Sequence, residues 1–224
     1  MAGATAYGLK PLAVRILSGT GMTIDERASI YCEVLEDIKT RLAVVRSVAE
    51  SHLNAGSELL NYEIAALNLR KSLELIAFGT LSANQEVYAE VHADFASHWN
   101  AKKLLAKLDK LHPEFYPKPV TREIRDLGPP RQLHFEFVPD GFLTRDELVE
   151  LYDMCSKVIH ARNPFSESSA INFRFSVLEW ASRIERLLGL HLVRLAGTPQ
   201  LWLAELSAPT DGRAHTYIAG PVSP

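Results

Sequence analysis

Residues 58–82, ELLNYEIAALNLRKSLELIAFGTLS, constrain the fold most, because apolar side chains fall on nearly every side of this stretch when it is drawn as a helix. A surface helix carries a single apolar stripe, so a helix that is apolar all round is expected at the centre of a bundle, packed by several neighbours. Its polar side chains are therefore informative. Glu63, Arg70 and Glu74 share one face by their spacing, and Arg70 and Glu74 are close enough along the helix to pair.

The neighbouring segments predict the rest of a helical bundle. Residues 23–52 place apolar side chains at three- and four-residue steps, with acidic residues early and basic residues late, which is typical of a long amphipathic helix. Thr144 and Glu147 carry the signature of a capping box, so a further helix should begin there. Together with residues 58–82, the predicted helices cover 23–52, 84–96, 98–111, 144–162 and 168–188. The fold class is therefore mainly α, a helical bundle of five to six helices.

The pattern changes after Gly189, which should end the last helix. The segments LHLVRLAG, LWLAELSA and AHTYIAG are typical of two or three antiparallel strands, with a hairpin at Asp211–Gly212. A shorter strand is expected at LHFEFV, whereas residues 113–133 begin with several prolines and are predicted to be a connection. The expected organisation is a loose N-terminal arm over 1–22, a helical domain over 23–189 and a small C-terminal antiparallel β-hairpin or sheet, an appendage, over 190–224.

Composition and charge exclude several classes of function. The chain has 24 Lys and Arg against 27 Asp and Glu, a net charge of −3, so no overall basic field attracts nucleic acid or an acidic membrane. Any contact with RNA would therefore have to use a local basic face of the protein. No segment is apolar over the roughly 18 residues that a membrane span requires, and the first residues lack the hydrophobic segment of a secretory signal. A cytoplasmic protein without membrane contact is expected.

Neither a metal site nor a cofactor is predicted. The two cysteines, Cys32 and Cys155, lie far apart, and the sequence has no C-x-x-C pair, so free thiols are expected. A glycine-rich phosphate loop, a G-x-S-x-G elbow and an H-E-x-x-H motif are all absent from the sequence.

The stretch KVIHARNPF, residues 157–165, carries the clearest candidate site, because it places His160, Arg162 and Asn163 directly before a proline. Two interpretations are open. In the first, the three residues only finish a helix, since a histidine in the last turn complements the helix dipole and an asparagine before proline commonly ends a helix. In the second, His160 is a general acid or base, Arg162 stabilises an anionic phosphate and Asn163 orients a ligand.

Three segments together resemble the HEPN superfamily of small helical domains: AALNLRKSLELIAF, SKVIHARNPF and FSVLEWASRIERLL. The resemblance covers about residues 24–188. Members of that superfamily are found in RNA-cutting toxins, phage-defence effectors and non-catalytic accessory proteins, and are usually homodimers. The resemblance implies a protein of the bacterial defence or toxin type that binds or cleaves RNA or binds a nucleotide, with an operon-encoded protein as a further partner. The apolar surface of the central and last helices also favours a homodimer.

Active members of the superfamily cleave RNA without a metal, using a histidine that follows an arginine by a few residues. In this chain His160 takes the histidine position, but the arginine is missing and Lys157 is the nearest upstream cation. The alternative is therefore a non-catalytic interaction or scaffold module in which residues 160–163 only terminate a helix. Arg70 and Glu74 either fix the packing of neighbouring helices as an ion pair or line a binding pocket that faces His160.

Overall fold

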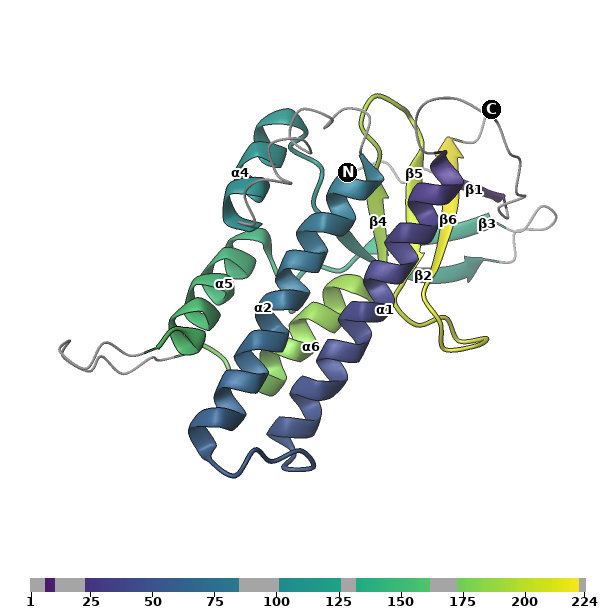
Figure 1. The fold of residues 1–224 in the computed structure, drawn as a ribbon. Coiled ribbons are helices and arrows are strands. Elements are labelled where there is room, and N and C mark those ends of the chain that lie inside the picture. The colour runs from purple at the N-terminus through teal and green to yellow at the C-terminus, as the bar shows by residue number, and fades with distance from the viewer. Residues whose placement is uncertain (1–6, 11–22, 85–100, 126–131, 162–172, 222–224) are drawn as a thin grey trace.

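The computed structural model describes residues 7–10, 23–84, 101–125, 132–161 and 173–221. Within these residues the elements follow in the order β1 (Tyr7–Lys10), α1 (Ile24–Ala49), α2 (Glu58–Ala83), α4 (Ala101–Leu111), β2 (Lys118–Arg125), β3 (Gln132–Phe137), α5 (Arg145–Ile159), α6 (Val177–Leu188), β4 (Leu190–Arg194), β5 (Leu201–Glu205) and β6 (His215–Pro221). Figure 1 shows α1 and α2 side by side, with α5 against α2, α6 against α1 and the strands gathered at one end of the bundle. The predicted class, mainly helical with a small antiparallel sheet, is confirmed.

Helices α1 and α2 form a hairpin because both are capped and both carry long apolar faces. Thr23 caps α1: its hydroxyl accepts a hydrogen bond from the N–H of Glu26, whose carboxylate accepts one from the N–H of Thr23. Ser57 caps α2 in the same way through its hydroxyl. The two helices approach closely at Gly79, where an added Cβ atom would lie 3.0 Å from Cε2 of Tyr31. A larger residue at this position would push the helices apart.

The predicted capping box of α5 is present. The hydroxyl of Thr144 accepts a hydrogen bond from the N–H of Glu147, and the Glu147 carboxylate accepts one from the N–H of Thr144. Helix α6 ends at Gly189 as predicted, but it begins at Val177, after the N-cap Ser176, so residues 173–176 precede it instead of belonging to it. Of the predicted helix over 84–96, residues 85–96 lie outside the described residues.

Strands β2 to β6 form an antiparallel sheet in the order β3-β2-β4-β5-β6. Strand β1 pairs with β6, and Tyr7 is also opposite Leu133 of β3, so the strands close into a barrel. The hairpin predicted at residues 211–212 joins β5 to β6, and Gly212 there has a φ of 69°, which a residue without a side chain adopts without strain. Because side chains alternate along each strand, one face of β4 and β5 meets the helices and the other lines the barrel.

Helices and strands share the main hydrophobic core. Leu35, Leu73, Leu151 and Ile184 from the helices lie in one buried cluster with Val193 and Trp202 from the strands. A second, smaller cluster inside the barrel consists of Val120, Leu192, Leu201 and Leu203. Since β4 and β5 contribute to the main core, the sheet is packed into the bundle and is not a separate attachment to it.

The strands come from more of the chain than predicted. The connection predicted over 113–133 contains β2, so that prediction was wrong for residues 118–125. The three closely spaced prolines at the beginning of this segment end at Pro119, just after the strand has begun. Residues 7–10 of the predicted arm form β1, and the rest of 1–22 lies outside the described residues. The sheet therefore takes strands from all three predicted parts of the chain: β1 from 1–22, β2 and β3 from 23–189, and β4 to β6 from 190–224. The predicted boundaries at residues 22 and 189 do not separate the sheet from the helices.

Both cysteines are free, as predicted. Burial raises the pKa of the Cys155 thiol to about 12, so this side chain behaves as a small core residue. Among the helices that the structure describes, none is long and apolar enough to cross a bilayer.

Candidate functional site

His160 is at the C-terminal end of α5, as the sequence predicts. Its backbone N–H donates a hydrogen bond to the carbonyl of Ser156, and its extended backbone, with φ −81° and ψ 137°, ends the helix. The imidazole is exposed, and no described residue is hydrogen-bonded to it. Arg162 and Asn163, the other two predicted catalytic residues, lie outside the described residues. No general acid–base partner of His160 is therefore placed by the structure.

His160 borders a cavity of about 1190 Å³, here called the basal cavity, at the end of the bundle where α1 and α2 are joined. Its walls are the last turn of α1, residues 58–65 of α2, the end of α5 and residues 173–178. Lys157, which the sequence assigns to the site, also lines it. The structure thus brings Lys157 and His160 together at one cavity, near segments that the sequence did not assign to the site.

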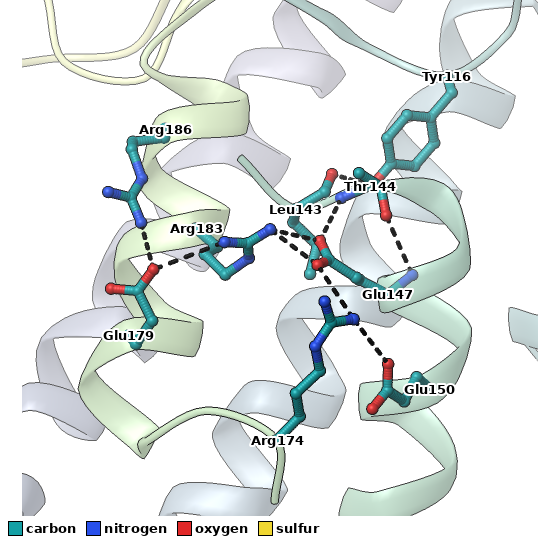
Figure 2. A network of polar contacts seen from close by, with 9 residues as sticks. All are labelled: Tyr116, Leu143, Thr144, Glu147, Glu150, Arg174, Glu179, Arg183 and Arg186. Carbon is teal, nitrogen blue, oxygen red and sulfur yellow. Dashed lines mark hydrogen bonds and ion pairs between the residues drawn. The ribbon is translucent and has the colours of Figure 1, made fainter. Parts of the chain in front are cut away.

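The charged residues of the basal cavity come from different elements. Lys157 and Arg174, with His160, line it from α5 and residues 173–178, whereas Glu58 and Glu63 line it from α2. Among the described residues Lys157, Glu58 and Glu63 have no ion-pair partner. Arg174 forms ion pairs with Glu147 and Glu150, at 3.8 and 3.9 Å, which are longer than hydrogen bonds (Figure 2). Lys157, Glu58 and Glu63 could therefore pair with charged groups of a ligand at this cavity.

Apolar side chains are exposed around the same cavity. The large hydrophobic residues exposed in the described part of the chain are Leu53, Leu59, Leu60, Tyr62, Leu67 and Phe137, and all but Phe137 lie on α2 or just before it. We call these five the basal apolar surface. Leu59 and Tyr62 are 59% and 48% exposed, and both line the basal cavity. The prediction that neighbours surround the central helix was wrong for its first turns, since α1 and α5 leave one side of it uncovered.

Arg70 and Glu74 form the predicted ion pair, with Nε and Oε1 3.2 Å apart. The guanidinium of Arg70 also donates a hydrogen bond of 3.0 Å to the Tyr152 hydroxyl, and it lies over the Tyr152 ring at 4.7 Å from the centroid. Both charged side chains are partly buried, with exposures of 22% and 24%. Neither lines the basal cavity. Through Tyr152 the pair joins α2 to α5, as the packing role requires.

A second polar network holds the beginning of α5 against α6 (Figure 2). The Nη2 atom of Arg183 donates to both carboxylate oxygens of Glu147, at 2.7 and 2.9 Å, and the rest of that guanidinium faces Glu179 at 3.6 Å. Burial alone raises the pKa of Glu147, but the hydrogen bonds from Thr144 and Arg183 outweigh it and leave the pKa below its ordinary value. Because its charges are matched, this network is a structural clamp.

His191, on strand β4, is fully buried and is not accessible to a ligand. Its Nδ1–H donates to the carbonyl of Leu188 at 3.0 Å, so Nε2 accepts the 2.7 Å hydrogen bond from the Tyr31 hydroxyl. Burial lowers the pKa of His191 to about 4 and raises that of Tyr31. Both side chains therefore stay neutral and serve to attach α1 to β4.

The residues that sequence analysis missed are Leu59, Tyr62 and Arg174. Their side chains are ordinary in a helix or a helix-entry segment, and only the arrangement of the neighbouring helices shows that they border a cavity. Groups of three or more potential metal ligands are absent from the described residues. Comparisons of the chain with protein-family models, curated proteins and solved structures find no match.

Proposed function

We propose that this protein is a non-catalytic interaction module that binds another polypeptide at the basal apolar surface and the adjoining cavity. The observation that carries the proposal is the concentration of exposed leucine and tyrosine side chains on one stretch of α2. Contiguous exposed apolar surface next to polar groups is typical of protein-binding sites, because contact with a partner removes that surface from water.

The shape and composition of the cavity suit a polypeptide ligand. A cavity of about 1190 Å³ that opens beside exposed Leu59 and Tyr62 can accept several apolar side chains from a helical or extended segment. The charges of Lys157, Glu58 and Glu63 would then fix the orientation of that segment. In this proposal His160 only ends helix α5. Its ring then needs no hydrogen-bond partner and can remain exposed, as the structure has it.

Under the HEPN resemblance, the proposal corresponds to a non-catalytic accessory protein of the bacterial defence or toxin type. The missing motif arginine supports this choice over ribonuclease activity, because His160 alone does not make the motif.

Photo-crosslinking tests the proposal directly. A photoreactive phenylalanine analogue placed at Tyr62 should crosslink to a polypeptide in the native host, giving a band heavier than the chain. The matched control is the same analogue at Phe137, which is 66% exposed at the end of β3, away from the basal surface. It should give no such band. Crosslinking at neither position, or equally at both, would contradict the proposal.

Binding of RNA or a nucleotide is a second candidate function, favoured by the cationic Lys157 and Arg174, which line the basal cavity together with His160. Lys157, His160 and Arg174 could contact phosphate groups there, and Tyr62 could stack on a base. Fluorescence anisotropy with labelled oligouridine and with labelled ATP, without added metal, tests this candidate. If it is correct, Lys157→Ala should weaken binding and flatten its salt dependence, while Lys118→Ala, an exposed lysine of β2, should change neither.

A further inference from the structure

We infer that the polypeptide bound by this protein is an amphipathic α-helix of a different protein, and that it lies along the outer side of α2. This inference rests on the proposed function and specifies the kind of partner. The outer side of α2 consists of Leu60, Ile64, Leu67 and Lys71, which we call the α2 seam. Helices α1 and α5 pack on two other sides of α2, as Figure 1 shows, and the α2 seam lies on the side that neither of them covers.

The leucines of the α2 seam are exposed, although the same helix has a buried apolar face. Leu60 and Leu67 are 45% and 43% exposed, Lys71 is exposed and Ile64 is half-buried. Leu69, by contrast, is buried in the main core. The two exposed leucines therefore contribute little to the core, and contact with a partner would remove their apolar surface from water.

The spacing of the α2 seam favours a helical partner. Its members follow one another at steps of four, three and four residues, which is the spacing of a coiled-coil seam. Side chains in such a row interdigitate with those of a second helix. An extended segment would find no backbone partners here, because the N–H and C=O groups of α2 are bonded within the helix. A helix satisfies its own backbone, so it suits this surface better.

Two charged residues specify the chemistry of the partner. Glu63 beside the α2 seam and Lys71 within it have no ion-pair partner in the part of the chain that the structure describes. They are eight positions apart, which corresponds to about 12 Å along α2. A purely apolar partner would cover both charges without compensation. The partner helix therefore carries a basic residue opposite Glu63 and an acidic residue opposite Lys71, and this order of charges fixes its direction.

Mapping of crosslinks tests the helical form of the partner. A photoreactive phenylalanine analogue is placed at Leu60 and, in a second variant, at Leu67 of the full chain in the native host. Mass spectrometry then identifies the crosslinked residue of the partner. The two positions are about 10 Å apart along α2, so the crosslinked residues should be about seven positions apart in a helical partner and about three in an extended one. A separation near three, or a product made of two copies of this chain, overturns the inference.

A charge reversal tests the recognition of Lys71. Lys71→Glu should lower the yield of the Leu67 crosslink at least about tenfold, because it brings like charges together. Lys71→Arg keeps the charge and should keep the yield. Lys118→Glu, at an exposed lysine of β2, is the control for a charge reversal outside α2 and should also leave the yield unchanged. An unchanged yield for Lys71→Glu, or equal losses for Lys71→Glu and Lys118→Glu, overturns the inference.

The helical partner and the proposed function fail in different ways. If Tyr62 crosslinks to another protein but Leu60 and Leu67 do not, the interaction module stands and the helix along the α2 seam is ruled out. If none of the three positions crosslinks, the proposed function itself is wrong. Circular dichroism on each variant shows whether the fold is retained.

Discussion

The two ends of the helix hairpin formed by α1 and α2 differ in their surroundings. Near the sheet, Tyr31 and His191 are buried and satisfy each other with a hydrogen bond, and Trp202 packs against the Tyr31 ring. At the basal end, Leu59 and Tyr62 are exposed, and the nearby Glu63 has no ion-pair partner among the described residues. The first arrangement pairs polar groups inside the protein, whereas the second leaves apolar and charged groups available outside it. The contrast separates residues that hold the fold from residues that can bind a partner.

The largest expected effect lies in the paired interior, at the clamp between α5 and α6. Arg183→Ala would remove the cation that hydrogen-bonds to both oxygens of the buried Glu147 carboxylate, so we expect a loss of about 3–5 kcal/mol in the free energy of unfolding. Arg186→Ala is the matched control on the same helix, because Arg186 is 46% exposed and Arg183 only 13%. Arg186→Ala should lower the free energy of unfolding by less than about 1 kcal/mol. Urea denaturation measures both, and equal losses would show that burial does not distinguish the two arginines.

The second prediction concerns acid stability through His191. Its pKa is about 4 in the folded protein, against an ordinary value of 6.5, so the unfolded chain binds more protons between these values. Stability should therefore fall as the pH drops from 6.5 to 4, by on the order of 3 kcal/mol from this residue.

The control for the acid experiment is His191→Gln, which keeps a donor and an acceptor but does not titrate. Urea unfolding of both proteins at pH 7 and pH 4.5 isolates the contribution of His191, because the carboxylates common to both cancel. An identical pH dependence in the two proteins would refute the assignment.

An intermediate effect is expected at Arg70, which joins α2 to α5. Arg70→Ala removes a partly buried ion pair with Glu74, a hydrogen bond to Tyr152 and the contact with the Tyr152 ring. We expect a loss of roughly 1–3 kcal/mol. Tyr152→Phe keeps the ring and the ion pair but loses the hydrogen bond, so it should cost less than Arg70→Ala. The reverse order, measured by denaturation, would show that the hydroxyl of Tyr152 matters more than the charge of Arg70.

The smallest effect is expected at the basal apolar surface. Leu59→Ser should change the stability of the dilute protein by no more than about 0.5 kcal/mol, because this side chain is exposed in the isolated chain. Leu69→Ala, at a fully buried position of the same helix, should cost about 2–5 kcal/mol. A large loss for Leu59→Ser in dilute, monomeric protein would mean that Leu59 holds the fold, and the contrast between the two ends of the hairpin would disappear.

Much of the helical structure was predictable because its signals are local. The capping box of Thr144 and Glu147, the helix stop at Gly189 and the pairing of Arg70 with Glu74 each depend on residues within a few positions of one another. The turn at residues 211–212 is equally local. The position of His160 at a helix end follows from the same rules.

The full extent of the sheet and the basal cavity could not be predicted, because both depend on contacts between segments that are distant in the sequence. Strand β2 carries proline at its start, and its partners are β3 beside it and β4, which lies beyond α5 and α6. Nothing within residues 118–125 marks that pairing. The cavity likewise forms only where the ends of α1, α2 and α5 meet residues 173–178.

The sequence by itself determined that the chain builds capped amphipathic helices and ends in strands, because hydrophobic period and caps act over a few residues. Only the tertiary structure decided which apolar side chains are covered. Leu59 and Leu69 lie on the same helix, and nothing in the residue type distinguishes them. Leu69 is buried by neighbouring helices and Leu59 is exposed beyond them. Burial depends on what packs against a side chain, which is fixed by segments far away in the sequence.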